Sequence, residues 1–199
     1  GGDFANGAIT SSIQFAVNQL QPSARERRAH ERFQEELSAA FSGRYASGAE
    51  GALFDTPEEA AFLWSDMAQA ITSRFDQYGF EAGAVLRRSG QQWTWSPPVA
   101  GSASGGSVNL FHFRSGLARV HTHPTENSFS GQGYFIRDGG PRPILGRGDG
   151  GGDLHNAWTK QADYYVALPS GRIDYFNYRA AAKAGGTRYL SDFVTTIRD

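Results

Sequence analysis

The sequence predicts an α+β fold in which helices flank a mixed β-sheet. Residues 22–75 carry apolar side chains at helical spacing, whereas residues 80–178 alternate short apolar and aromatic runs with Gly and Pro turns. A second helical segment interrupts these runs, so helices, strands, a helix and further strands follow one another. With 199 residues, 39% of them hydrophobic and 20% charged, the chain is long enough for one globular domain with a substantial core.

Two helices are expected before the first strand, after an opening (1–21) that is interpreted as a linker running into a short helix. In 22–41, a narrow apolar stripe predicts a helix lying on the core; the stripe is Ala29, Phe33, Leu37 and Phe41. In 56–75, Thr56 can cap a helix that has Pro57 in its first turn and Glu59 completing a capping box. Its expected buried stripe is Ala60, Leu63, Trp64, Met67, Ile71 and Phe75.

The remaining elements follow from turns and alternation. Strands are expected in 80–101 (two strands around a Ser-Gly turn, with an exit at Pro97 and Pro98), 107–113, 117–123 and 163–178 (two strands around Pro-Ser-Gly). Half of the residues from 139 to 152 are glycine, which predicts a long flexible loop. Residues 153–162 predict a short helix, and 190–199 an amphipathic tail.

Composition narrows the chemistry. Because the chain has no cysteine, any metal must be held by His, Asp or Glu. The formal net charge of −1 gives no support for binding to a nucleic-acid backbone or an anionic membrane. No apolar run approaches the roughly 20 residues of a membrane-spanning helix, and the start lacks the pattern of a secretory signal.

The motif His121-Thr122-His123-Pro124 is the main candidate for a metal site. In an extended segment, residues i and i+2 project to the same side, so the two imidazoles can converge on one ion. A catalytic zinc site needs a third protein ligand, often a carboxylate, and a further acidic group to take a proton from water.

Several stretches together resemble the JAB1/MPN/JAMM metalloproteases, whose pattern is Glu, then His-x-His-Pro, then Ser-x-x-Asp at a helix start. The resemblance is closer to the JAB-like domains that form C-terminal toxin modules of Rhs-type and other polymorphic toxins. It rests on "TPEEAA", "FEAGAVLRR", "GQQWTWSPPVAG", "HTHP" with "FS", and "YYVALPSGRIDYF", in that order over about 60% of the chain. The opening "GGDFANGAIT" is similar to the junction that precedes the toxin tip in Rhs proteins.

The resemblance implies roles for individual residues. Glu81 matches the general base, and His121 and His123 match two metal ligands. Ser130, or as a second choice Ser128, matches the serine that would hydrogen-bond the substrate carbonyl or the activated water. The aspartate is missing from its usual place, because Ser-x-x-Asp counted from Ser130 ends at Gly133.

Asp153 is the preferred third ligand. It opens the helix predicted at 153–162 and stands sixteen residues before Pro169, about where the resemblance places the aspartate. A helix N-terminus also favours the ionised carboxylate. This choice makes 131–152 a Gly-rich insertion, and it leaves Asp138, Asp149 and His155 as alternatives.

The resemblance implies a cytidine-deaminase-like α/β sandwich that binds one Zn²⁺ and hydrolyses an amide bond. Residues 1–50 would be a linker and N-terminal helical extension, and 51–199 the JAB-like hydrolase. The implied setting is an antibacterial effector, delivered by an Rhs-type, type VI or other secretion system into the cytoplasm of a target bacterium. Its implied partners are a protein substrate, a carrier protein and a cognate immunity protein.

Two alternatives stay open on the sequence. The histidines could serve a nuclease toxin acting on DNA or RNA, which the near-neutral charge disfavours. The gap at Gly133 also fits a degenerate JAB-like domain that binds without cutting.

Overall fold

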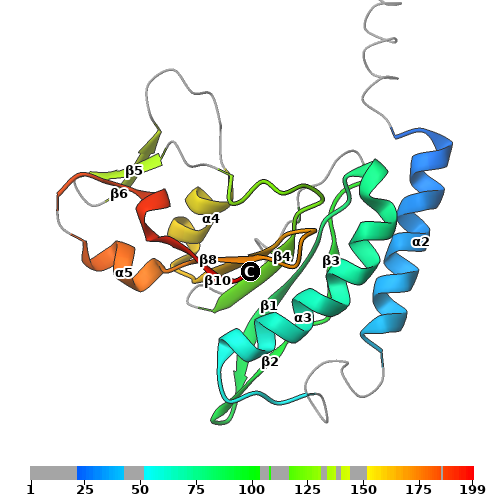
Figure 1. Cartoon of the computed structure of the whole chain (residues 1–199), viewed down its shortest axis with the longest axis horizontal. Helices are drawn as coiled ribbons and strands as arrows, with labels where there is room; N and C mark the ends of the chain where they lie inside the picture. Colours follow the sequence, from blue (N-terminus) through cyan, green and yellow to red (C-terminus); the bar gives the residue numbers. More distant parts are fainter. Residues whose placement is uncertain are drawn as a thin grey trace, which may run out of the picture.

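The computed structural model describes residues 22–42, 52–103, 108, 117–130, 134–137, 140–143, 152–184 and 186–199. Over these residues the fold is α+β, with a mixed sheet flanked by helices, as predicted (Figure 1). The main sheet has seven strands in the order β10-β8-β7-β4-β1-β2, with β3 paired to β1. Among the strand pairs that the structure describes in this sheet, β4 and β7 run parallel and the others antiparallel. The helix or linker expected at 1–21 and the strand expected at 107–113 lie outside the description, apart from residue 108.

The strands of the main sheet are β1 (Ala82–Ser89), β2 (Gln92–Trp95), β3 (Val99–Ala100), β4 (Ala118–Thr122), β7 (Tyr164–Ala167), β8 (Ile173–Phe176) and β10 (Val194–Arg198). The helices are α2 (Ala24–Ala40), α3 (Pro57–Thr72), α4 (Asp153–Lys160) and α5 (Tyr178–Lys183), with 3₁₀ turns η2 (Ser73–Tyr78) and η3 (Leu190–Phe193). A small second sheet has the order β6-β5-β9, with β5 (Tyr134–Arg137), β6 (Gly140–Pro143) and β9 (Arg188–Tyr189).

Helices α2 and α3 lie on one side of the main sheet (Figure 1). Both begin with a complete capping box, at Ser23 and at Thr56, so two otherwise unpaired backbone donors are satisfied at each start. The predicted stripe of α2 is buried. In α3 the buried face centres on Trp64, whereas Leu63 and Met67 are only half-buried and the helix ends at Thr72, short of Phe75.

The opposite side of the sheet is covered by α4, α5 and the small sheet (Figure 1). Here the prediction of a loop through 139–152 is wrong at β6, which pairs with β5 in an antiparallel hairpin. Ile136 of β5 is buried in this second core, and Tyr134 packs on His155 of α4. Hydrophobic burial on the inner strand therefore anchors the hairpin despite its glycines.

Strand β4 lies at the centre of the main sheet and separates the two cores. Successive side chains point to opposite faces, so Val120 packs on the α3 side while Arg119, His121 and His123 face the α4 side. The predicted amphipathic tail likewise joins the sheet, since its last residues form the edge strand β10 beside β8.

Candidate metal centre

Three predicted residues, His121, His123 and Asp153, come together at the end of β4. The histidine Nε2 atoms lie 3.1 Å apart. Asp153 completes a triangle, with Oδ1 lying 3.4 Å from Nε2 of His121 and Oδ2 lying 3.4 Å from Nε2 of His123. The strand supplies the histidines, and the first residue of α4 supplies the carboxylate.

These distances suit a shared cation. Ligand atoms about 2.1 Å from a tetrahedral ion stand about 3.4 Å from one another, close to the three separations. The side chains of His121, His123 and Asp153 are only 4%, 9% and 20% exposed, so the three groups are largely shielded from bulk solvent. Two imidazoles and one carboxylate also leave a coordination position open, and the group can therefore hold a metal ion.

Asp153 is held in place by Ser130, which lies on the far side of the insertion. Its Oδ2 accepts hydrogen bonds from the Ser130 hydroxyl at 2.7 Å and the Ser130 backbone N–H at 2.9 Å. In return, the backbone N–H of Asp153 donates to the Ser130 hydroxyl at 2.9 Å, and the N–H of Leu154 donates to the Ser130 carbonyl at 3.2 Å. Ser130 thus caps α4, whose own N-cap residue, Gly152, has no side chain to do so.

This arrangement bears directly on the predicted role of Ser130. Its hydroxyl was expected to contact the substrate or the activated water, and in the structure it binds the carboxylate of Asp153. In the Ser-x-x-Asp pattern the serine and the aspartate are three positions apart, and Gly133 stands where that aspartate would be. Here Ser130 and Asp153 are 23 positions apart in the sequence, yet they are hydrogen-bonded in the structure.

His123 is oriented by a second contact that the sequence did not reveal. Its Nδ1 lies 2.6 Å from the backbone carbonyl of Asn127, so Nδ1–H donates there and Nε2 is left to bind a cation. The same loop is tied down by Glu126, whose carboxylate accepts from the N–H and the hydroxyl of Ser170 at 2.7 and 2.9 Å. No sequence motif predicts either contact. His123 contacts a backbone carbonyl, that of Asn127, and Glu126 contacts Ser170, in a turn distant in the sequence.

Glu81 stands beside the same group. The β1–β4 register pairs Gly83 with His121, so two residues further along Glu81 lies opposite His123 on the same face. Burial raises the pKa of the Glu81 carboxyl, the neighbouring His121 and His123 reduce that shift, and Asp153 adds to it. The N–H of Val108 also donates to Glu81 Oε2 at 3.3 Å.

The surroundings of Asp153 and His123 shift the pKa values of both groups. Burial disfavours the ionised form of Asp153, but the two histidines outweigh it and hold the pKa of this carboxyl far below its usual range. Burial likewise disfavours a charged His123, yet hydrogen bonding and the charge of Asp153 leave the pKa of this imidazole raised. Asp153 is therefore an anion throughout the physiological range, as a metal ligand must be.

The other candidates are placed apart from the group or outside the description. His155 packs its ring on Tyr134, with centroids 4.9 Å apart, and does not belong to the cluster. Ser128 lines the cavity beside the site without joining the ligands. Asp138, Asp149 and Gly133 lie outside the described residues.

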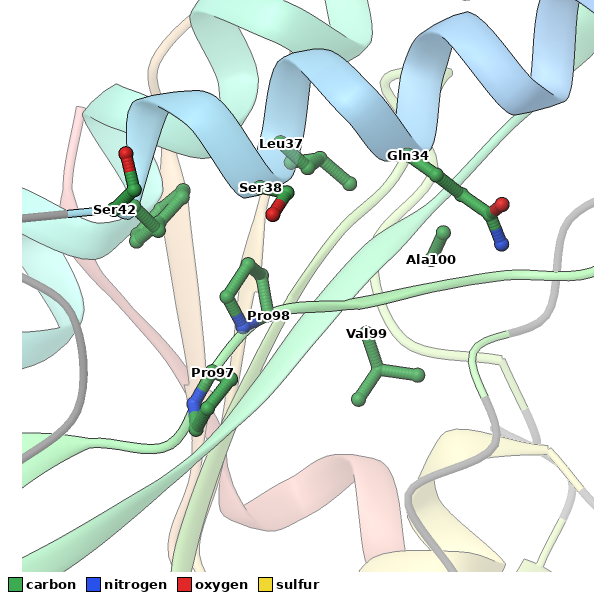
Figure 2. Close-up of a pocket in the computed structure, with 9 residues that line it drawn as sticks. Gln34, Leu37, Ser38, Ser42, Pro97, Pro98, Val99 and Ala100 are labelled. Atoms are coloured by element: carbon green, nitrogen blue, oxygen red, sulfur yellow. The ribbon is translucent and has the colours of Figure 1, made fainter.

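A cavity of about 470 Å³ opens over the group. Glu81, His123 and Asp153 lie on its wall with Pro124, Thr125, Asn127, Ser128, Phe129 and Ser130. A hollow of about 480 Å³ lies elsewhere, between α2 and residues 97–100, and its lining holds no His, Asp or Glu (Figure 2). We assign the candidate chemistry to the cavity at the end of β4 because two members of the metal group, His123 and Asp153, line it together with Glu81.

Comparison with protein-family models, curated proteins and solved structures finds no match to this chain. Among the described residues, no helix has the length and apolar character needed to cross a membrane.

Proposed function

We propose that this protein is a zinc-dependent amide hydrolase of the JAB/MPN type, with a cytidine-deaminase-like arrangement of its sandwich. The observation that carries the proposal is the convergence of Asp153 with His121 and His123, beside a half-buried Glu81. A His₂-carboxylate set with an open position is typical of zinc hydrolases.

Zinc held by His121, His123 and Asp153 would supply Lewis acidity, which polarises a carbonyl group and makes water easier to deprotonate. Glu81 is the group that moves the proton. Its raised pKa suits a carboxylate that accepts a proton from the attacking water and returns it to the leaving amine. Ser130 acts on Asp153 and is a positioning residue in this scheme.

The biological setting is proposed from the resemblance to Rhs-associated JAB toxins. The domain would act as an antibacterial effector delivered into the cytoplasm of a target cell, where it would cut a protein. A carrier protein and a cognate immunity protein would be its partners in the producing cell.

Metal analysis of the purified protein tests the first part of the proposal. We expect about one zinc per chain in the wild type and in Glu81→Gln, and almost none in Asp153→Ala. Iron in place of zinc would contradict it, because two histidines and one carboxylate also serve non-haem iron enzymes. An Asp153→Ala protein that keeps its zinc would show that another group is the third ligand.

Proteomics of bacteria expressing the domain tests the second part. New peptide termini should appear with the wild type and be absent with Glu81→Gln. Intact proteins together with degraded plasmid or RNA would instead support a nuclease. If the Glu81→Gln variant stops growth as the wild type does, the domain would act by binding without hydrolysis.

A further inference from the structure

The residue between the two histidines, Thr122, has contacts of its own. It is 0% exposed and points to the α3 side, opposite to the imidazoles. Its hydroxyl oxygen accepts a hydrogen bond from the backbone N–H of Ala82 at 3.0 Å. The same oxygen lies 3.1 Å from the hydroxyl of Thr72, the last residue of α3.

The contact with Ala82 falls where the pairing between β1 and β4 ends. The paired residues run from Leu86 opposite Ala118 to Gly83 opposite His121. One step further, Ala82 reaches the side chain of Thr122, which extends the pairing of these strands by one residue. Without that hydroxyl the N–H of the fully buried Ala82 would lose this partner, a costly loss.

Ala82 directly follows Glu81, so this hydrogen bond also fixes the backbone of the proposed proton carrier. On the other side of β1, the carbonyl of Glu81 accepts from the N–H of Gly101 at 2.7 Å. The chain at Glu81 is thus held from both neighbouring strands, and Thr72 connects the first of these two contacts to α3.

We propose that Thr122 is a positioning residue, whose hydroxyl holds the start of β1 so that Glu81 stays beside His121, His123 and Asp153. That Glu81 needs this position rests on the proposed function. That Thr122 holds the start of β1 rests on the two contacts of its hydroxyl, with Ala82 and Thr72. The side chain of Thr122 belongs neither to the metal group nor to the lining of the cavity. It acts through the backbone of Ala82.

Amide exchange measured by NMR on the metal-free protein tests the contact without reference to zinc. In Thr122→Val, which keeps the shape and removes the hydroxyl, the N–H of Ala82 should exchange about tenfold faster, because its partner is lost. In Thr122→Ser it should exchange at the wild-type rate. The N–H of Ala84, further along β1, is the internal control and should not change in either variant.

Zinc affinity tests the consequence for Glu81 by a double-mutant cycle. A carboxylate beside a dication adds to its affinity, so Thr122→Val should weaken zinc binding about threefold to tenfold through the displaced Glu81. In the Glu81→Gln background the same substitution should have almost no further effect. Thr122→Ser should match the wild type in both backgrounds.

The outcomes separate this inference from the proposed function. Unchanged exchange at Ala82 in Thr122→Val, or an equal loss of zinc affinity with and without Glu81, would overturn the role of Thr122. A wild-type protein that binds no zinc would contradict the proposed function, and amide exchange alone would then decide whether Thr122 holds β1. Circular dichroism establishes that each variant folds, and Thr122→Ala replaces Thr122→Val should the latter fail to do so.

Discussion

The two faces of strand β4 differ in what surrounds them. On the α3 side, Val120 and its neighbours lie in a core of large apolar groups, including the fully buried Trp64, Phe33 and Phe80. On the α4 side, Arg119, His121 and His123 are almost as deeply buried, with 1%, 3% and 7% of the whole residue exposed, and their side chains contact polar groups. The first face stabilises the fold through burial of apolar area, and the second places ionisable groups where water is scarce.

This comparison separates changes that should act on folding from changes that should act on metal binding. The first kind should lower the free energy of unfolding with or without zinc. The second should act mainly on the part of that free energy which bound zinc adds.

The largest effect is expected on the α3 side. Trp64→Ala empties the centre of that core and should lower the free energy of unfolding by about 3–5 kcal/mol. Urea denaturation of metal-free protein measures it, and Trp93→Ala, at a half-buried tryptophan of the edge strand β2, should cost less. Equal losses in the two variants would contradict the central place given to Trp64.

The next largest effect is expected at Asp153. Asp153→Ala removes a proposed ligand and should weaken zinc binding by more than about 100-fold, since loss of a mere outer partner already costs 10–100-fold. Competition with a zinc-chelating dye measures the affinity. Asp66→Ala removes an exposed carboxylate of α3 that pairs with Arg198, and it should leave the affinity unchanged.

A smaller effect is expected at Ser130. Ser130→Ala frees the Asp153 carboxylate and uncaps α4, so zinc affinity should fall about tenfold and the free energy of unfolding by about 1 kcal/mol. Calorimetry of both forms measures the two quantities. Ser42→Ala, which removes a hydroxyl bonded to a carbonyl of α2, is the matched control. A normal zinc affinity in Ser130→Ala would show that α4 alone orients Asp153.

The smallest effect is expected with pH. The raised pKa of His123 in the metal-free protein means that its charged form adds stability below about pH 6.5, and that this stability is lost as the pH rises through the raised pKa. Zinc requires the neutral imidazole, so its own contribution grows over the same range. The difference in Tm between zinc-loaded and metal-free protein should therefore widen from pH 6 to pH 8. A constant difference would contradict the coupling of His123 to Asp153.

The sequence predicted well where a local pattern determines the structure. The capping box at Thr56, the stripe of α2 and the alternation around His121 and His123 depend on a few neighbouring residues, and all three are present in the structure. The position of Asp153 needed a long-range inference, and the structure places it with the two histidines.

The sequence does not predict contacts that depend on tertiary packing. The hairpin of β5 and β6 forms in a Gly-rich segment because Ile136 has a core to enter, which composition does not reveal. The hydrogen bond of Ser130 to Asp153 and the carbonyl of Asn127 on His123 depend on how separate loops meet. The hydrogen bonds of the Thr122 hydroxyl likewise depend on residues distant in the sequence, Ala82 and Thr72.

The link between Ser130 and Asp153 also bears on how such a site can vary. These two residues are joined by reciprocal hydrogen bonds, although 23 positions separate them along the chain. Each doubling of the length of a closed flexible loop costs only about 0.6 kcal/mol in entropy. Added chain that leaves β5 and β6 intact would therefore cost little stability, so new recognition elements could be grafted between these two residues while the hydrogen bonds of Ser130 keep Asp153 in place.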